Sequence, residues 1–122
     1  MEVQQYQPSL QDQLRHVVEC GGKERVRDVI NRGADVNYCP PGERPLLEIA
    51  IYRLYPDHDI TRILLDAGYD VNTVNSEGEN ALFAASHQGD TEAVSILLEY
   101  KIVQCFYYVV VEIISLSMKM MS

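Results

Sequence analysis

Basic residues are scarce in this sequence. Its 122 residues include 10 Lys and Arg against 18 Asp and Glu, which gives a formal net charge of -8. Binding to duplex DNA or RNA needs a basic face that can neutralise phosphates, so we expect no nucleic-acid partner. An acidic surface instead suits a basic protein partner, although most surface charge of this kind simply keeps a protein soluble.

Cysteine pairs and a secretion signal are also absent. The three cysteines, Cys20, Cys39 and Cys105, are widely spaced and form no C-x-x-C pair. They therefore predict no disulfide framework. The first residues contain no basic stretch followed by an apolar run, which is the pattern of a signal peptide. We expect reduced thiols in an intracellular protein, either cytoplasmic or nuclear.

Motifs for catalysis are missing as well. The sequence contains neither a G-x-S-x-G nucleophile motif nor a phosphate-binding G-x-x-x-x-G-K-S/T loop. His16, His58 and His87 are scattered along the chain, and with Cys20 they do not give zinc-ligand spacing. We therefore predict that the chain is not an enzyme, has no catalytic residues, and holds no cofactor and no metal.

Short apolar stripes at helical spacing are what the sequence does contain. Leu14, Val17 and Val18 illustrate the spacing, because they fall at i, i+3 and i+4. Asp12 is the expected N-cap of that first helix. Similar stripes, separated by Gly or Pro turns, predict five further helices over residues 23–32, 45–52, 59–67, 81–88 and 91–100.

Two five-residue stretches share one pattern and end two of these helices. They are residues 33–37, Gly-Ala-Asp-Val-Asn, and residues 68–72, Gly-Tyr-Asp-Val-Asn. Each glycine suits the left-handed position just past a helix, where a side chain would clash. We call these two stretches the stop signals. Because the same signal occurs twice in a short chain, it predicts a structural repeat.

The repeating unit resembles the ankyrin repeat. The third unit carries the family pattern as Gly-Glu-Asn-Ala-Leu-Phe-Ala-Ala over residues 78–85, followed by Gly-Asp-Thr-Glu-Ala-Val over residues 89–94. From Gly68 to the matching Lys101 is 33 positions, the period of that family. The resemblance implies an all-α ankyrin-repeat solenoid of about three stacked helix-turn-helix repeats, at residues 12–41, 42–77 and 78–101, with residues 1–11 as a leader.

The resemblance also implies a function, namely non-catalytic binding of a protein partner as an adaptor or scaffold. In a stacked array the turns project on one side, and the first helices of the repeats line a concave face. Among the exposed side chains, aromatic and large apolar ones would anchor a partner best. The turn candidates are Tyr38, Glu43, Arg44, Thr73, Asn75, Ser76, Glu77 and Glu79, and the face candidates are Arg15, Glu19, Leu47, Ile51, Phe83 and His87.

The pattern stops at Lys101, and residues 102–122 form an atypical hydrophobic tail. Three interpretations remain open. The tail could be a C-terminal capping helix, with a polar stripe over the last repeat. Residues 102–118 could instead anchor a membrane-tethered ankyrin protein, although Glu112 would lie inside the membrane at a cost of about 3 kcal/mol. Finally, the tail could be unrelated sequence from a truncated or alternative ending.

Overall fold

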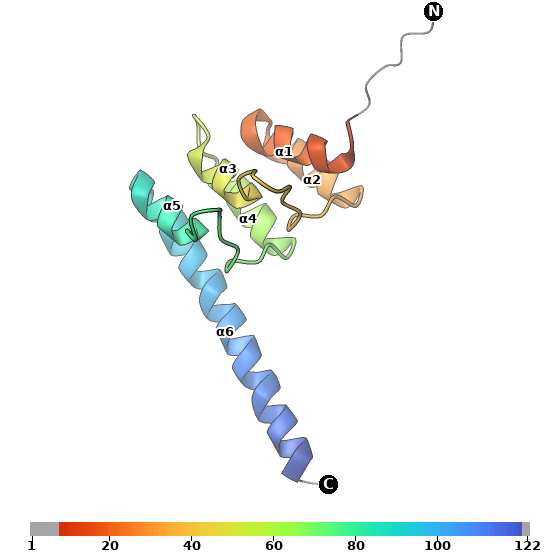
Figure 1. Ribbon diagram of the computed structural model, residues 1–122, viewed down its shortest axis with the longest axis vertical. Helices are drawn as coiled ribbons and strands as arrows, with labels where there is room; N and C mark the ends of the chain where they lie inside the picture. The colour runs from red at the N-terminus through yellow and green to blue at the C-terminus, as the bar shows by residue number, and fades with distance from the viewer. Residues whose placement is uncertain (1–7, 121–122) are drawn as a thin grey trace, which may run out of the picture.

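The computed structural model describes the backbone of residues 8–120 and the side chains of residues 8–101 and 111–120. Six α-helices make up the described part of the chain (Figure 1). Only an isolated antiparallel bridge between Val74 and Asn80 supplements them in the described residues. The helices are α1 (Leu10–Cys20), α2 (Lys23–Asn31), α3 (Leu46–Tyr52), α4 (His58–Asp66), α5 (Ala81–Gln88) and α6 (Thr91–Met120).

The helices form two layers. Consecutive helices pair as α1 with α2, α3 with α4, and α5 with α6. Between the pairs, α3 packs against both α1 and α5, while α4 packs against both α2 and α6. The predicted stack of three helix pairs is therefore confirmed, and Figure 1 shows the pairs side by side in chain order. One layer consists of α1, α3 and α5, which are the first helices of the repeats.

The first helix begins earlier than the sequence pattern indicated. Helix α1 starts at Leu10, within the range predicted as leader, and Ser9 is its N-cap. The side-chain oxygen of Ser9 accepts a hydrogen bond from the backbone N–H of Asp12 at 3.2 Å. The prediction of Asp12 as the cap is therefore wrong, because Ser9 already satisfies the first-turn N–H group. Residues 1–7 of the predicted leader lie outside the described residues.

The two stop signals do more than end α2 and α4. Gly33 and Gly68 have φ angles of 107° and 97°, a conformation that favours glycine. The Asn37 side chain in the first signal donates to the carbonyl of Gly68 at 3.0 Å and accepts from the N–H of Asp70 at 2.8 Å. The first signal thus binds the second directly. The Asp-Val-Asn pattern therefore links neighbouring repeats through hydrogen bonds.

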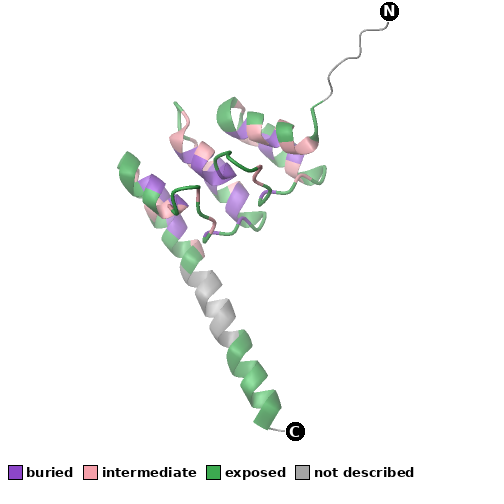
Figure 2. Cartoon of the chain, in the orientation of Figure 1, coloured by how far each residue is buried: buried purple, intermediate pink, exposed green. Residues whose placement is uncertain are grey.

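The core lies between the two layers, and the middle repeat is the most completely buried (Figure 2). Both Leu47 and Ile51 of α3 are buried there, which contradicts their predicted exposure on the concave face. The reason is that α3 is covered by α1, α4 and α5 together. The apolar spacing of Leu46, Ile49 and Ala50 in the sequence predicts that Ile49 is buried, but Ile49 is only half-buried. The buried stripe of α3 is therefore rotated toward Leu47 and Ile51.

Helix α6 continues past the end of the ankyrin-like pattern. The position that holds Gly33 and Gly68 in the first two repeats holds Lys101 in the third, and lysine favours a helix where glycine ends it. Residues 111–120 are all exposed on a helix that projects away from the stack (Figures 1 and 2). They do not cover the third repeat, so the capping interpretation is wrong for this segment.

The membrane interpretation of the tail has a separate outcome. In the part of the chain that the structure describes, no helix has the length and apolar character needed to cross a membrane. The side chains of residues 102–110, including Cys105, lie outside the described residues. The interpretation of the tail as unrelated sequence stays a prediction.

Candidate binding surface

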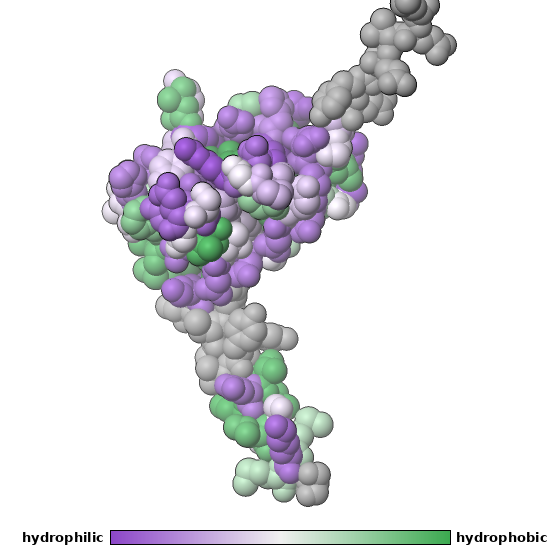
Figure 3. Space-filling view, viewed as in Figure 1, coloured by the Kyte–Doolittle hydropathy of each residue, from purple (hydrophilic) through white to green (hydrophobic). Residues whose placement is uncertain are grey.

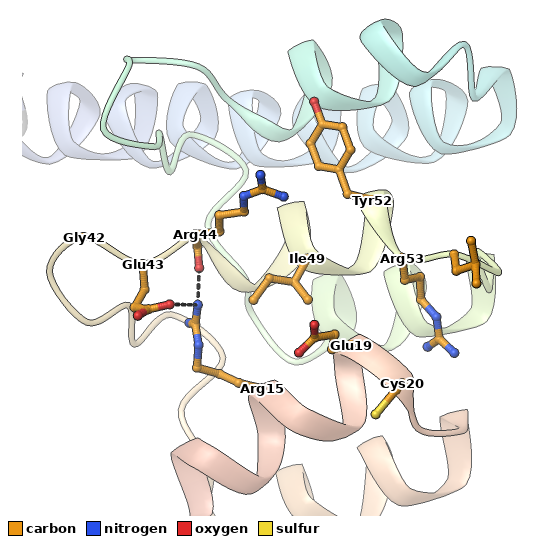
Figure 4. A pocket seen from close by; sticks show the side chains of 10 residues that line it. Arg15, Glu19, Cys20, Gly42, Glu43, Arg44, Ile49, Tyr52 and Arg53 are labelled. Atoms are coloured by element: carbon orange, nitrogen blue, oxygen red, sulfur yellow. Dashed lines mark hydrogen bonds and ion pairs between the residues drawn. The ribbon is translucent and has the colours of Figure 1, made fainter.

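Two adjoining hollows lie along the layer formed by α1, α3 and α5. The first hollow has a volume of about 690 Å³ and lies between α1, α3 and the turn at residues 42–44. Figure 4 shows its lining, with Glu19 and Ile49 facing it from α1 and α3. The remaining lining residues are Arg15, Cys20, Gly42, Glu43, Arg44, Tyr52, Arg53 and Leu54.

Arg15 joins α1 to the turn at one end of this hollow. Its Nη2 donates to the backbone carbonyl of Arg44 and lies 3.8 Å from a carboxylate oxygen of Glu43 (Figure 4). Its Nη1 is buried without a hydrogen-bond partner. A buried donor of this kind costs free energy, so the contacts of Nη2 must offset it for the turn to hold its place against α1.

Arg44 and Tyr52 form the ridge between the two hollows. The guanidinium carbon of Arg44 lies 5.5 Å from the centre of the Tyr52 ring, within range of a cation–π interaction. Both residues line both hollows. This contact holds a positive charge and an aromatic ring at the middle of the surface.

The second hollow continues beyond the ridge, between α3, α5 and the turn at residues 75–79. Its volume is about 480 Å³. Its lining contains four carboxylates and one guanidinium, so it is acidic, whereas the first hollow is lined by three arginines and two glutamates. The charged residues of the second hollow are Glu43, Arg44, Glu48, Glu77 and Glu79.

Asn75 organises the turn that borders the second hollow. Its side-chain oxygen accepts hydrogen bonds from the N–H groups of Glu77 at 2.9 Å and Glu79 at 3.0 Å. Its amide donates to the carboxylates of Glu48 at 3.3 Å and Glu79 at 3.2 Å. Buried Glu48 on α3 is thereby joined to the turn of the next repeat. A substitution of Asn75 would disturb the turn and two carboxylates together.

We call the two hollows and their shared ridge the charged groove. Of the fourteen candidates from the sequence, the groove brings nine together: Arg15, Glu19, Glu43, Arg44, Asn75, Ser76, Glu77, Glu79 and His87. Five others lie elsewhere. Tyr38 is exposed but lines neither hollow, Thr73 is half-buried, and Leu47 and Ile51 belong to the core. Phe83 is exposed and stacks on His87, with their ring centres 6.1 Å apart and the ring planes nearly parallel.

Among the charged and aromatic residues of the groove, three were not singled out from the sequence: Glu48, Tyr52 and Arg53. Tyr52 and Arg53 sit where α3 ends, in the stretch where the repeat pattern loosens, so their direction could not be inferred. Arg53 donates to the Val18 carbonyl at 3.3 Å and thereby links α3 to α1. A signal for Glu48 existed, since it is an acidic residue within an apolar helix, a setting that calls for a hydrogen-bond partner.

On the other layer, charged side chains connect the repeats. Lys23 and Asp59 form an ion pair at 2.9 Å between α2 and α4. The hydrogen bond and charge of Lys23 lower the pKa of Asp59, and the same contact raises the pKa of Lys23. Both groups are exposed, so water screens the pair and its contribution to stability is small.

His58 connects the second and third repeats in the same layer. Its Nε2 lies 2.9 Å from Asp90, and its Nδ1 lies 3.0 Å from Glu92. Burial opposes ionisation of Asp90, but hydrogen bonds from the Ala93 N–H and from His58 outweigh it, so the pKa of Asp90 is lowered. We therefore assign His58, Asp90 and Glu92 to the contact between the two repeats.

The described side chains give no support for a metal site. Among them, no group of three His, Cys, Asp or Glu residues is placed to hold a metal ion. Cys20 and Cys39 are free thiols. What the described surface offers is a groove lined by charges from all three repeats.

Comparison with known proteins agrees with this arrangement. A family model described as "Ankyrin repeats (3 copies)" matches residues 14–107, which is most of the chain. A comparison with curated proteins found no match. Ankyrin repeats generally act as protein–protein interaction modules and are typically non-catalytic. The predicted all-α ankyrin solenoid is thus confirmed, and the chain belongs to the ankyrin-repeat family.

Proposed function

We propose that this chain is a non-catalytic adaptor or scaffold that binds a protein partner in the charged groove. The observation that carries the proposal is the groove itself, whose two adjoining hollows lie along the first helices and turns of the stack. Its two hollows share the Arg44–Tyr52 ridge. Arginine and tyrosine are residue types that supply much of the binding energy in protein interfaces.

The charges of the groove indicate the chemistry of the partner. The hollow between α3 and α5 has an excess of carboxylates, in line with the net charge of the whole chain. An extended basic segment of a partner would place Lys or Arg side chains there. Complementary charge of this kind raises the association rate and excludes acidic competitors. The mixed charges of the first hollow would accept a segment that is closer to neutral.

Site-specific photo-crosslinking tests whether a partner occupies the groove. A photoreactive phenylalanine analogue is placed at Tyr52 in the groove and, as a matched control, at Tyr55, an exposed tyrosine just beyond α3. Both proteins are then exposed to light in cells. We expect the probe at position 52 to capture a discrete partner that the probe at position 55 does not capture.

Charge reversal then tests the chemistry. Glu43→Lys with Glu77→Lys changes two exposed carboxylates of the acidic hollow. Glu24→Lys with Glu99→Lys makes the same change in charge on exposed positions of α2 and α6. We expect the first pair to weaken binding of the captured partner about tenfold and the second to change it less than about twofold. Equal weakening by both pairs would contradict groove binding.

A further inference from the structure

The described end of the tail, residues 111–120, is an exposed apolar helix. Six of its side chains are large and hydrophobic, and each is between 45% and 87% exposed. Figure 3 shows hydrophobic surface gathered along this segment. Exposed hydrophobic side chains gathered on one segment mark an interaction site in a soluble protein. The six are Val111, Ile113, Ile114, Leu116, Met118 and Met120.

We propose that residues 111–120 pair with the same segment of a second copy of this chain, as antiparallel helices. The charged residues of the segment indicate a second copy as the partner. They are Glu112 and Lys119, seven positions apart and therefore on one side of the helix. In an antiparallel pair centred between residues 114 and 115, each Glu112 lies within one helical turn of Lys119 of the second copy. A parallel pair would instead leave each Glu112 without a lysine of the second copy beside it.

The same registry defines the apolar seam of the pair. Ile113, Leu116 and Met120 are spaced by three and four residues, as the core positions of a coiled coil are. Glu112 and Lys119 each precede a seam residue, so they flank the layer in which Ile113 meets Leu116 of the second copy.

The shape of the chain leaves room for this pairing. Helix α6 carries the segment away from the ankyrin stack (Figure 1). Between Lys101 and the centre of the pair lie about 13 residues, or roughly 20 Å of helix. Two antiparallel copies therefore hold their stacks about 40 Å apart along the shared axis, at opposite ends, and leave both charged grooves open. The pairing does not rest on the function proposed above.

Sedimentation equilibrium of the full chain over a range of concentrations tests the proposal. We expect a reversible monomer–dimer equilibrium. Ile113→Gln with Leu116→Gln should raise the dimer dissociation constant at least about tenfold. Val111→Gln with Ile114→Gln, a matched control on the opposite side of the helix, should change it less than about twofold. All four positions lie outside the stack, so the thermal melt of the ankyrin domain should not change.

Charge exchange distinguishes a second copy from any other occupant. Glu112→Lys or Lys119→Glu alone should weaken the dimer about fivefold, because each places like charges opposite each other. The two substitutions combined should restore wild-type affinity. A chain that is monomeric at every concentration would overturn the proposal. So would large aggregates equally sensitive to both apolar pairs, a double exchange that fails to restore the dimer, or a monomer that instead partitions onto phosphatidylcholine vesicles.

Discussion

Replacing Asp90 with alanine should destabilise the junction between the second and third repeats. The Asp90 carboxylate accepts a hydrogen bond from the Ala93 N–H at 3.1 Å in the first turn of α6. It also lies 2.9 Å from Nε2 of His58 on α4. One side chain thus stabilises the start of a helix and the contact between two helix pairs. It is only 16% exposed, so water replaces these bonds poorly.

The size of the effect follows from the two contacts. Loss of a helix N-cap costs about 1 kcal/mol. Loss of a partly buried hydrogen bond to a charged group adds about another 1 kcal/mol after allowance for exposure. We therefore expect Asp90→Ala to lower the free energy of unfolding by about 2 kcal/mol. Asp90→Asn can still cap the helix, so it should lose only about half of that.

Urea unfolding monitored by circular dichroism measures the change. With a slope of about 1–2 kcal/mol per molar urea, Asp90→Ala should lower the midpoint by about 1–2 M. Glu92→Ala is the matched control, because Glu92 contacts the same imidazole at 3.0 Å but is 57% exposed. It should cost no more than about 0.5 kcal/mol. Equal midpoints for wild type and Asp90→Ala would refute the reasoning.

The difference in unfolding free energy between wild type and Asp90→Ala should depend on pH. Because the folded state lowers the pKa of Asp90, the ionised carboxylate stabilises the fold. Its contribution is fully present above the pKa of an unfolded aspartate, near 4, and is lost as the pH falls through the lower folded value. The gap in stability between wild type and Asp90→Ala should therefore be constant from about pH 5 to 7 and narrow below about pH 4.

Three further predictions concern single residues of the stack. Leu47→Ala should cost about 3 kcal/mol in thermal melts, because this fully buried side chain of the middle repeat would leave a cavity. Asn75→Ala should cost about 1–2 kcal/mol and speed hydrogen exchange at the Glu77 and Glu79 amides, which lose their acceptor. Tyr100→Phe should cost about 0.5–1 kcal/mol at neutral pH, because Tyr100 donates a hydrogen bond to Asp66. Burial, followed by that bond, raises the Tyr100 pKa to about 12, so its stabilisation should be lost as the pH rises from about 10 through 12.

Much of the fold could be predicted because local signals repeat. Gly33 and Gly68 follow the ends of helices because the backbone there adopts a left-handed conformation that favours glycine. A glycine at such a position can be recognised from the sequence alone. Helix α5 has the predicted bounds, residues 81–88, because Asn80 caps it and Gly89 ends it. Signals of this kind depend on neighbours in the sequence alone.

The placement of single side chains in the candidate site was harder to predict. Ile51 and Leu47 are buried because α1 and α5 cover α3 from both sides, which its own seven residues do not reveal. Asn37 pairs with a stop signal more than thirty positions away, a contact that no local pattern encodes. In the tail, Lys101 in place of a glycine indicated that the repeat pattern ends there. The pattern did not predict that α6 would continue as one helix to Met120.

The most direct test of groove binding is how the affinity for the captured partner depends on salt concentration. Isothermal titration should give the affinity of the wild-type chain for that partner at low and at high salt. If basic residues of the partner occupy the acidic hollow, affinity should fall steeply with salt for wild type and only slightly for Glu43→Lys with Glu77→Lys. The same salt dependence in both proteins would mean that the partner binds elsewhere.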